Sequence, residues 1–330
     1  MLRRVTSTCF VTGASGFLGR ALVPRLAQRH DLRLLVRAGQ QLPQFDAFDW
    51  QRVEGRLDDE AALRRGVDGA DLVVHMAALV SFRPEDRARM FAVNRDGTAL
   101  LARLAREANV GRFLHVSTIS AVAWSAGPIE LDERAPYNFG SLRHGYSDSK
   151  FAAERCVLDE VRRGLDAVIV NPPSMYGPGD RRKGDDSLLG AVFEGRVRVA
   201  PPGGLNVANV DDVSDGIVRA IERGRSGERY ILGGENLTGR ELLVRIAAIV
   251  GGRAPRRTVP RALLQASARA LRWKERALGG SRPPMTSEIL ELACRHLWFS
   301  SDKAARELDW RAGPVDDGIR AAWRELQANG

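Results

Sequence analysis

Short apolar runs and longer amphipathic segments alternate through the first half of the chain. The apolar runs predict buried strands at 8–13, 31–37, 71–78, 112–117 and 166–171. Apolar residues at helical spacing predict helices at 17–30, 59–66, 85–109 and 146–163. Strands that alternate with helices are typical of βαβ units with right-handed crossovers. We therefore predict an α/β fold with a doubly wound parallel sheet.

The pattern becomes irregular after the last of these strands. Residues 171–180, NPPSMYGPGD, contain three prolines and two glycines and predict a loop that leaves a strand end. Two further helices are predicted at 208–224 and 237–252, with a strand at 227–234 between them. The alternation continues less regularly here, which indicates a second, smaller region.

This change divides the chain into two parts. We assign residues 1–172 to the domain with the doubly wound sheet and residues 173–330 to a smaller, interleaved region. Residues 206–234 are expected to return to the main sheet, because their helix and strand continue the earlier alternation. Ligands of open α/β sheets bind at the carboxyl ends of the strands. We therefore expect the smaller region to contact the substrate.

A glycine-rich segment, TGASGFLG at 12–19, joins the first predicted strand to the first predicted helix. In the spacing GxxGxxG, the first glycine permits a tight turn and the second lets the backbone approach a pyrophosphate. The third allows the helix to pack closely on the sheet, and the helix N-terminus attracts the anion. A purely structural turn is the alternative, but the position favours a Rossmann-type dinucleotide site. The residues predicted to bind the dinucleotide here are Gly13, Ser15, Gly16, Phe17, Leu18 and Gly19.

The end of the second predicted strand bears on the choice between NADP and NAD. The usual fingerprint has an acidic residue there that binds the adenine ribose, but this strand ends in Arg37. An arginine can pair with a 2′-phosphate. The alternative is a solvated residue at a strand end. We predict that Arg37 binds the cofactor and that the cofactor is NADP, with NAD as the alternative.

Tyr146 and Lys150 are four residues apart, so on a helix their side chains share a face. A nearby cation favours the phenolate and lowers the pKa of a tyrosine. Tyr146 could then exchange a proton with a substrate oxygen while a hydride moves to or from nicotinamide. Thr118, or else Ser117, follows a predicted strand and is placed to hold that oxygen.

With these features the chain resembles, over nearly its whole length, the extended short-chain dehydrogenase/reductase superfamily, the NAD-dependent epimerase/dehydratase group. The likeness rests on TGASGFLG at 12–19, HMAA at 75–78, NRDGT at 94–98, VSTIS at 116–120, YSDSK at 146–150, NPPSMYGPGD at 171–180 and VDDV at 210–213. The resemblance implies that Tyr146 is the catalytic acid/base, that Lys150 lowers its pKa and binds the nicotinamide ribose, and that Thr118 is the catalytic hydroxyl. It also implies cofactor contacts at Leu57, Ala77 and Asn171.

Three departures from the family pattern bear on the substrate. Arg56 stands where the family often has an aspartate on the adenine. Leu205 stands where nucleotide-sugar members usually carry an arginine that binds the diphosphate, and Asn171-Pro172 replaces their common Arg-Pro. These changes favour a resemblance to dihydroflavonol reductases, 3β-hydroxysteroid dehydrogenases and hopanoid-associated sugar epimerase-like proteins.

We therefore predict an NADP-dependent oxidoreductase that moves a hydride between nicotinamide and a carbonyl or alcohol of an apolar small molecule. Met175 and Tyr176 follow a strand end and are predicted to line the substrate pocket. The alternative enzyme is a nucleotide-sugar epimerase or dehydratase with a tightly held NAD. An alternative of another class is a redox sensor or scaffold that binds the cofactor without turnover.

The net charge of +9 and the pI of about 10.1 come mostly from one stretch. Residues 251–278 carry eight basic side chains against Glu275, and the rest of the chain is nearly neutral. We therefore expect no nucleic-acid partner. Residues 261–278 predict an amphipathic helix, either a solvated cover over the substrate cleft or a weak membrane-surface contact. Its apolar residues are Leu264, Ala268, Leu271 and Leu278.

The remaining features predict an ordinary cytoplasmic enzyme. Cys9, Cys156 and Cys294 are far apart and odd in number, which predicts free thiols in a reducing compartment. His75 and His115 lack acidic or cysteine partners at metal-ligand spacing, so we predict no metal. No apolar run is long enough to form a membrane helix. We also expect a homodimer through the helix at 146–163.

Overall fold

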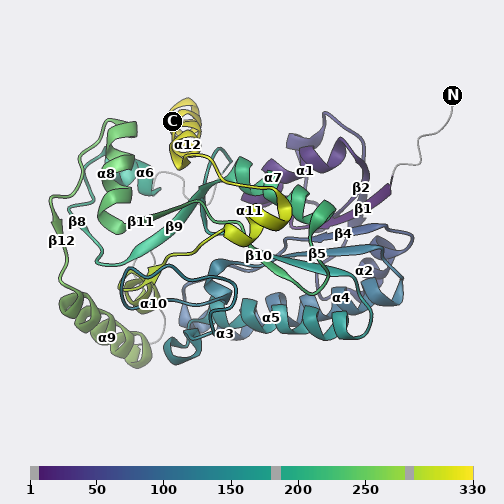
Figure 1. Cartoon of the computed structure of the whole chain (residues 1–330), viewed down its shortest axis with the longest axis horizontal. Coiled ribbons are helices and arrows are strands. Elements are labelled where there is room, and N and C mark those ends of the chain that lie inside the picture. The colour runs from purple at the N-terminus through teal and green to yellow at the C-terminus, as the bar shows by residue number, and fades with distance from the viewer. Residues whose placement is uncertain (1–6, 180–186, 279–285, 330) are drawn as a thin grey trace.

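The computed structural model describes residues 7–179, 187–278 and 286–329, apart from the side chains of Arg276, Leu278 and Asn329. Within these residues, seven parallel strands form the central sheet in the order β10-β6-β5-β4-β1-β2-β3 (Figure 1). The strands are β1 (Ser7–Thr12), β2 (His30–Val36), β3 (Trp50–Glu54), β4 (Leu72–His75), β5 (Arg112–Val116), β6 (Ala167–Asn171) and β10 (Arg229–Ile231). The predicted doubly wound parallel sheet is therefore confirmed.

Helices cover both faces of this sheet, as Figure 1 shows. One face carries α1 (Phe17–Ala27), α7 (Val210–Arg223) and α11 (Asp302–Leu308); the other carries α2 (Glu60–Val67), α4 (Gly97–Glu107) and α5 (Gly145–Arg162). Cys9 and Val11 pack into the core under α1 and α7, whereas Phe10 between them packs into the core on the other face. Successive residues of an inner strand thus face opposite cores, and because an inner strand is buried on both faces, its sequence is a continuous apolar run.

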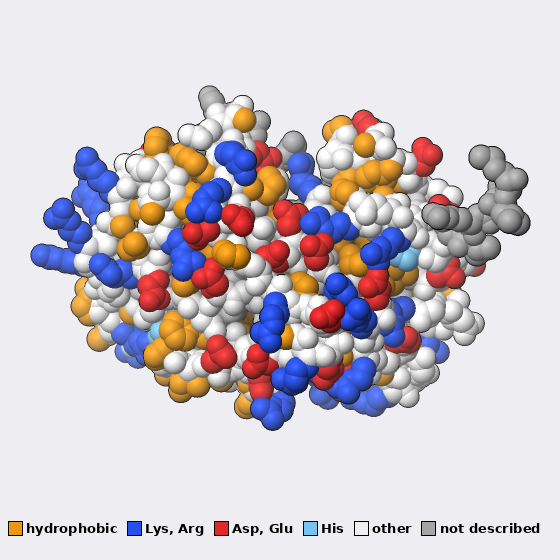
Figure 2. All heavy atoms as spheres, turned by 45° about the horizontal axis from the view of Figure 1, so that its top comes forward, with side chains coloured by type: hydrophobic (Ala, Val, Ile, Leu, Met, Phe, Trp, Pro, Cys, Tyr) orange, Lys and Arg blue, Asp and Glu red, His pale blue; other side chains and the backbone are white. Residues whose placement is uncertain are grey.

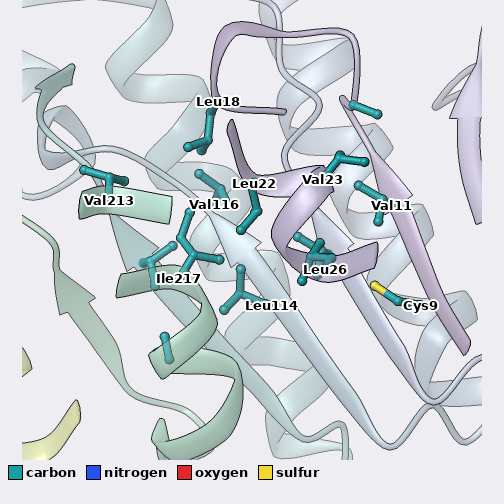
Figure 3. Close-up of a cluster of buried hydrophobic side chains, with 14 of the residues drawn as sticks. Cys9, Val11, Leu18, Leu22, Val23, Leu26, Leu114, Val116, Val213 and Ile217 are labelled. Atoms are coloured by element: carbon teal, nitrogen blue, oxygen red, sulfur yellow. The ribbon is translucent and has the colours of Figure 1, made fainter. Parts of the chain in front are cut away.

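Figure 3 shows the core between the sheet and its first helices. Leu22 and Leu26 of α1 and Ile217 of α7 point toward Leu114 and Val116 of β5, and all five side chains are buried. The segment 210–223 is distant in sequence from α1 but packs beside it on the same face of the sheet. Of the residues expected to return to the main sheet, α7 and β10 do so.

The smaller region has its own sheet and core. Strands β11 (Glu235–Thr238), β9 (Gly204–Asn209) and β13 (His296–Leu297) lie side by side, and β7 (Ser174–Tyr176) pairs with β9. Strands β8 (Val199–Ala200) and β12 (Arg257–Thr258) form a separate pair. The helices here are α6 (Leu188–Phe193), α8 (Gly239–Val250), α9 (Arg261–Leu278), α10 (Ser287–Leu292) and α12 (Val315–Asn329). None of the described helices is both long enough and apolar enough to cross a bilayer.

The predicted helix at 85–109 is helical without a break over 84–107, but the type of helix changes along it. It consists of the 3₁₀ turn η2 (Pro84–Asp86), α3 (Arg87–Met90), the π-helical η3 (Phe91–Asp96) and α4. The π-helical segment contains Asn94, whose buried side chain accepts a hydrogen bond from the Leu79 amide at 2.7 Å and donates to the Leu79 carbonyl at 3.0 Å. This tertiary contact holds the helix on the loop after β4.

The predicted loop at 171–180 also differs from the structure, because Ser174–Tyr176 form β7 within it. The short strands β3, β7, β9, β11 and β13 were not predicted, since their burial follows no sustained period of two. The remaining short 3₁₀ turns are η1 (Pro43–Phe45), η4 (Ile119–Ala121) and η5 (Phe139–Leu142).

Candidate active site

The glycine loop lies between β1 and α1, beside the point where the strand order reverses between β1 and β4. Gly13 has φ +82°, and a Cβ on it would lie 2.6 Å from the Ala77 backbone nitrogen. A Cβ on Gly19 would lie 2.3 Å from the Ala14 carbonyl oxygen. Only glycine fits these two close approaches, so the chain has a backbone cradle of the kind that holds a dinucleotide pyrophosphate.

The other residues of the loop that are predicted to bind the dinucleotide differ in how far they are buried. Ser15 and Gly16 are exposed, whereas Phe17 and Leu18 are buried in the core of the main domain. Gly16 is the N-cap residue of α1 and provides no side-chain cap, which leaves first-turn amides available to an anion. Backbone groups at 16–18 could therefore bind phosphate, while the side chains of Phe17 and Leu18 hold the helix on the sheet.

A buried chain of hydrogen bonds links the end of β1, just before the glycine loop, to β4 and α4. His75 Nδ1 lies 2.7 Å from Thr12 Oγ1, and His75 Nε2 lies 2.8 Å from Thr98 Oγ1. Thr12 Oγ1 also accepts a hydrogen bond from the Ala77 amide at 3.3 Å. Burial, with a smaller effect of the Lys150 charge, lowers the pKa of His75 to about 3, so its ring is neutral. These contacts hold Ala77 against Gly13.

Lys150 reaches from α5 to the carboxyl end of β5. Its Nζ donates a hydrogen bond to the Val116 carbonyl at 2.8 Å and lies 3.3 Å from Nε2 of His115. Burial lowers the pKa of Lys150 to about 8, and the charge of Glu154 opposes this shift. A lysine with this pKa still carries most of its charge at pH 7. Sequence reasoning missed the contact with His115, because it depends on how α5 packs on the strand.

Tyr146 lies one helical turn before Lys150, and its side chain is half-buried. Thr118 comes two residues after the end of β5 and is the N-cap residue of η4, where its hydroxyl oxygen accepts a hydrogen bond from the Ser120 amide at 3.2 Å. The hydroxyl proton of Thr118 is then available to another acceptor. Ser117, the alternative to Thr118, is buried beside the Glu154 carboxyl.

Two asparagines position these elements. Asn171, at the end of β6, donates hydrogen bonds to the Thr118 carbonyl at 2.8 Å and to Glu154 Oε1 at 2.7 Å. Asn94 donates to Ser149 Oγ at 3.0 Å, between Tyr146 and Lys150 on α5. The Asn171 amide nitrogen is therefore used inside the protein, which indicates a positioning role for a side chain predicted to contact the cofactor.

The predicted adenine-side residues lie at the ends of adjacent strands. Arg37 follows β2 directly and is exposed, and its guanidinium makes no hydrogen bond or ion pair with the residues that the structure describes. Leu57 follows β3 and packs on α4, where a Cβ on Gly97 would lie 2.8 Å from the Leu57 Cβ. Arg37 is thus available to an incoming anion at the strand end next to the glycine loop.

Met175 and Tyr176 lie on β7 and line a cavity of about 40 Å³ with Leu188 and Leu326. Gly177, which also lines this cavity, packs near the glycine loop, since a Cβ on it would lie 3.7 Å from the Phe17 ring. A much larger cavity, of about 1140 Å³, is lined by mostly charged residues from the outer side of α5 and from the region of β10 and α11. None of its described lining residues belongs to the glycine loop or to 115–118 or 146–150.

Helix α10 packs on the N-terminus of α5 through a buried carboxyl group. Glu288 Oε1 accepts a hydrogen bond from the Gly145 amide at 3.5 Å, and Glu288 Oε2 lies 3.8 Å from His144 Nε2. Burial raises the pKa of Glu288 to about 7 and lowers that of His144 to about 4. The folded protein therefore favours the uncharged form of both groups.

We expect Glu288→Gln to remove a pH dependence of stability between about pH 4.5 and 7. The folded pKa of Glu288 lies above its unfolded value, so the folded state binds the proton more tightly and the free energy of unfolding falls as pH rises through this range. His144 has the opposite slope, and it is present in both proteins. Urea unfolding at pH 5 and pH 8 measures the difference, with exposed Glu54→Gln as the control. Equal pH dependence in the wild type and Glu288→Gln would contradict this role.

The fold and the loop define the class of protein: a doubly wound sheet whose first strand-to-helix turn is a glycine cradle belongs to the dinucleotide-binding α/β proteins. The model of the NAD dependent epimerase/dehydratase family matches residues 9–233. The chain belongs to this family, whose members use a nicotinamide cofactor.

Individual relatives agree with this assignment. Sterol demethylase protein B of Methylococcus capsulatus is 32% identical and aligns over 97% of both chains. The putative dihydroflavonol 4-reductase of Synechocystis is 30% identical over 97% of this chain and 95% of its own. The crystal structure of gox2253 is 32% identical, covers 98% of this chain and 99% of its own, and superposes with a TM-score of 0.85. The chain is an enzyme of the extended short-chain reductase and dehydrogenase type.

Proposed function

We propose that the protein is an NADP-dependent oxidoreductase that reduces a carbonyl, or oxidises the matching alcohol, of an apolar small molecule. One observation carries the proposal: Lys150 is buried at the end of β5, with Tyr146 one turn before it on α5 and Thr118 two residues after Val116, the residue whose carbonyl Lys150 binds. This arrangement brings an acid/base, a cation and a hydroxyl donor to the carboxyl end of the central sheet.

In the reducing direction, Thr118 donates a hydrogen bond to the substrate carbonyl oxygen and Tyr146 donates its proton to that oxygen. NADPH, when bound, would supply a hydride to the carbonyl carbon, and the products would be the alcohol and NADP⁺. The Lys150 ammonium stabilises the tyrosinate left behind. Asn171 and Asn94 hold Thr118 and α5 in place through the contacts described above.

The apolar substrate class is supported by Leu205, a half-buried residue of β9 at the position where nucleotide-sugar members usually carry a diphosphate-binding arginine. Leucine offers no hydrogen bond to a phosphate. The names of the two curated relatives, which refer to a sterol and to a dihydroflavonol, agree with an apolar ligand. A nucleotide-sugar epimerase with tightly bound NAD is the rival, and the nucleotide content of the purified protein separates the two.

We expect Arg37→Ala to reduce the preference for NADPH over NADH by roughly tenfold or more. The variant would lack a charge-assisted hydrogen bond to the 2′-phosphate, and such a bond typically contributes about 1.5–3 kcal/mol to the binding free energy. Titration of the cofactor-free protein with each nucleotide measures the preference. Arg324→Ala, an exposed arginine on α12 without a described partner, is the matched control.

The first experiment is to denature the freshly purified protein and identify any released nucleotide. An empty or exchangeable site with an NADPH preference supports the proposal. Stoichiometric NAD would contradict the proposal and favour the epimerase mechanism. An unchanged preference for NADPH over NADH in Arg37→Ala would show that Arg37 does not bind the cofactor.

We also propose a homodimer through α5. The Phe151 ring of this helix already stacks on Tyr137 within the subunit, with ring centroids 4.0 Å apart. The interface would therefore use the other outward residues of the helix, and sizing chromatography that shows a monomer at micromolar concentration would exclude it.

A further inference from the structure

Helix α9 has two apolar faces. The predicted apolar residues lie on the inner one: Ala268 is buried, Leu264 and Leu271 are half-buried, and the Leu278 side chain lies outside the described residues. The same side carries Glu275, which accepts hydrogen bonds from the Ser287 amide at 3.0 Å and the Ser287 hydroxyl at 2.5 Å. This face holds α9 on α10.

The outer face of α9 is apolar as well, and it faces solvent. Leu263 is 60% exposed and Trp273 is 73% exposed, the highest value among the large apolar side chains that the structure describes. At 3.6 residues per turn, the exposed apolar residues fall within a stripe about 100° wide. These residues are Ala262, Leu263, Ala266, Ala270, Trp273 and Ala277. A stripe of this kind on a monomer indicates an interaction surface.

Cations border this stripe. Arg269 and Lys274 lie about 20° beyond its two edges at the same helical pitch. Both are exposed, and neither makes an ion pair or hydrogen bond with a described residue. In contrast, Arg272 on the inner side pairs with Glu291, and Arg261 binds the Ala126 carbonyl.

The segment before the helix adds further positive charge. Arg253, Arg256 and Arg257 are exposed and have no ion-pair partner among the described residues. Figure 2 shows basic side chains projecting from the end of the molecule where Figure 1 places β12. We call this set, residues 253–257 with the outer face of α9, the α9 surface.

We propose that the α9 surface docks on an anionic lipid bilayer. Tryptophan prefers the boundary between headgroups and acyl chains, and burial of leucine among the acyl chains has a favourable free energy. The bordering cations attract anionic headgroups. Duplex nucleic acid would use the cations but leave the apolar stripe in water. A second copy of the same surface, related by a two-fold axis, would bring like charges together. Of these three partners, only the bilayer would bury the apolar stripe and also pair with the bordering cations.

Docking would place the catalytic end of the protein close to the membrane. Helix α9 packs on α10, and Glu288 of α10 binds the amide of Gly145, the residue before Tyr146. An apolar substrate dissolved in the bilayer would then reach the site without crossing bulk water. This consequence rests on the proposed function, whereas the docking does not.

The test is sedimentation of the full chain with vesicles of phosphatidylcholine, either pure or with roughly 30% phosphatidylglycerol. We expect binding to the anionic vesicles that weakens at least tenfold when salt rises from about 50 to 500 mM. Leu263→Ser with Trp273→Ser, and separately Arg269→Gln with Lys274→Gln, should each weaken binding by about tenfold or more. The matched control, Arg311→Gln with Arg324→Gln, removes two exposed cations elsewhere and should change binding less than twofold.

Several results would overturn the docking. These are no binding to anionic vesicles, equal binding to neutral vesicles, equal loss in the control, or a preference for duplex DNA. Self-association that the α9 variants abolish, without vesicle binding, would instead assign the surface to a second copy. Circular dichroism and NADPH titration of each variant show that the fold and the cofactor site are intact. Vesicle binding by a protein that reduces no carbonyl would retain the docking and reject the proposed function.

Discussion

Tyr146→Phe is expected to lower kcat for carbonyl reduction by roughly 10²–10⁴-fold while NADPH binding stays within about twofold of the wild type. The substitution removes the hydroxyl that we propose as the proton donor and leaves the ring, the helix and the buried Lys150 in place. Steady-state kinetics on a panel of apolar ketones, with cofactor titration on the same preparations, would measure both quantities.

Tyr230→Phe is the matched control, because it also removes one phenol hydroxyl, here from a buried residue that donates to Glu307 at 2.8 Å. Its kcat should stay near that of the wild type. A fully active Tyr146→Phe would contradict the acid/base role of Tyr146. Parallel loss of NADPH binding and activity would instead show that Tyr146 supports the cofactor site.

Glu154→Ala is expected to lower the free energy of unfolding by about 1–3 kcal/mol, the cost of leaving a buried hydrogen-bond donor without its acceptor. Glu154 is 2% exposed, accepts a hydrogen bond from Asn171 at 2.7 Å and lies 3.4 Å from Arg229 Nη1. Its loss leaves the Asn171 amide without this acceptor and the guanidinium without its carboxylate. Urea unfolding, followed by intrinsic fluorescence, measures the change in midpoint.

Two comparison variants sharpen this prediction. Glu154→Gln keeps an oxygen for Asn171 and should cost less than Glu154→Ala. Asp159→Ala removes an exposed ion pair with Arg162 on the same helix and should change stability by less than about 1 kcal/mol. A loss below about 1 kcal/mol in Glu154→Ala would show that water replaces the carboxylate beside Arg229. Since Asn171 also holds the Thr118 carbonyl, kcat should fall in Glu154→Ala as well.

The main sheet was predictable because its signals are local. Each central strand is buried on both faces and is therefore a continuous apolar run, as Cys9, Phe10 and Val11 illustrate. The edge strand β3 escaped prediction because only Val53 of its five residues is buried. The helix at 261–278 was predicted with the bounds of α9, but the predicted apolar residues describe only its inner face.

The candidate site also has features that local sequence predicts and features that depend on contacts between distant segments. The spacing of glycines at 13, 16 and 19 and the four-residue separation of Tyr146 and Lys150 follow from backbone geometry that neighbouring residues determine. The contacts of Lys150 with Val116 and His115 could not be predicted in this way, because both residues belong to a strand more than thirty residues away. The roles of Arg37 and Thr118 toward a ligand remain predictions.

The sequence by itself determined the order of β1, β2, β4, β5 and β6 and of the helices between them. It also determined the glycine cradle and the pairing of a tyrosine with a lysine on one helix, because each of these features depends on steric and periodic constraints within a few residues. The tertiary structure decided which buried polar groups meet: His75 with Thr12 and Thr98, and Asn171 with Glu154. It also decided that α9 turns its second apolar face to solvent. The physical reason is that buried donors and acceptors must find partners wherever the packed chain brings them, and this choice is made between segments distant in sequence.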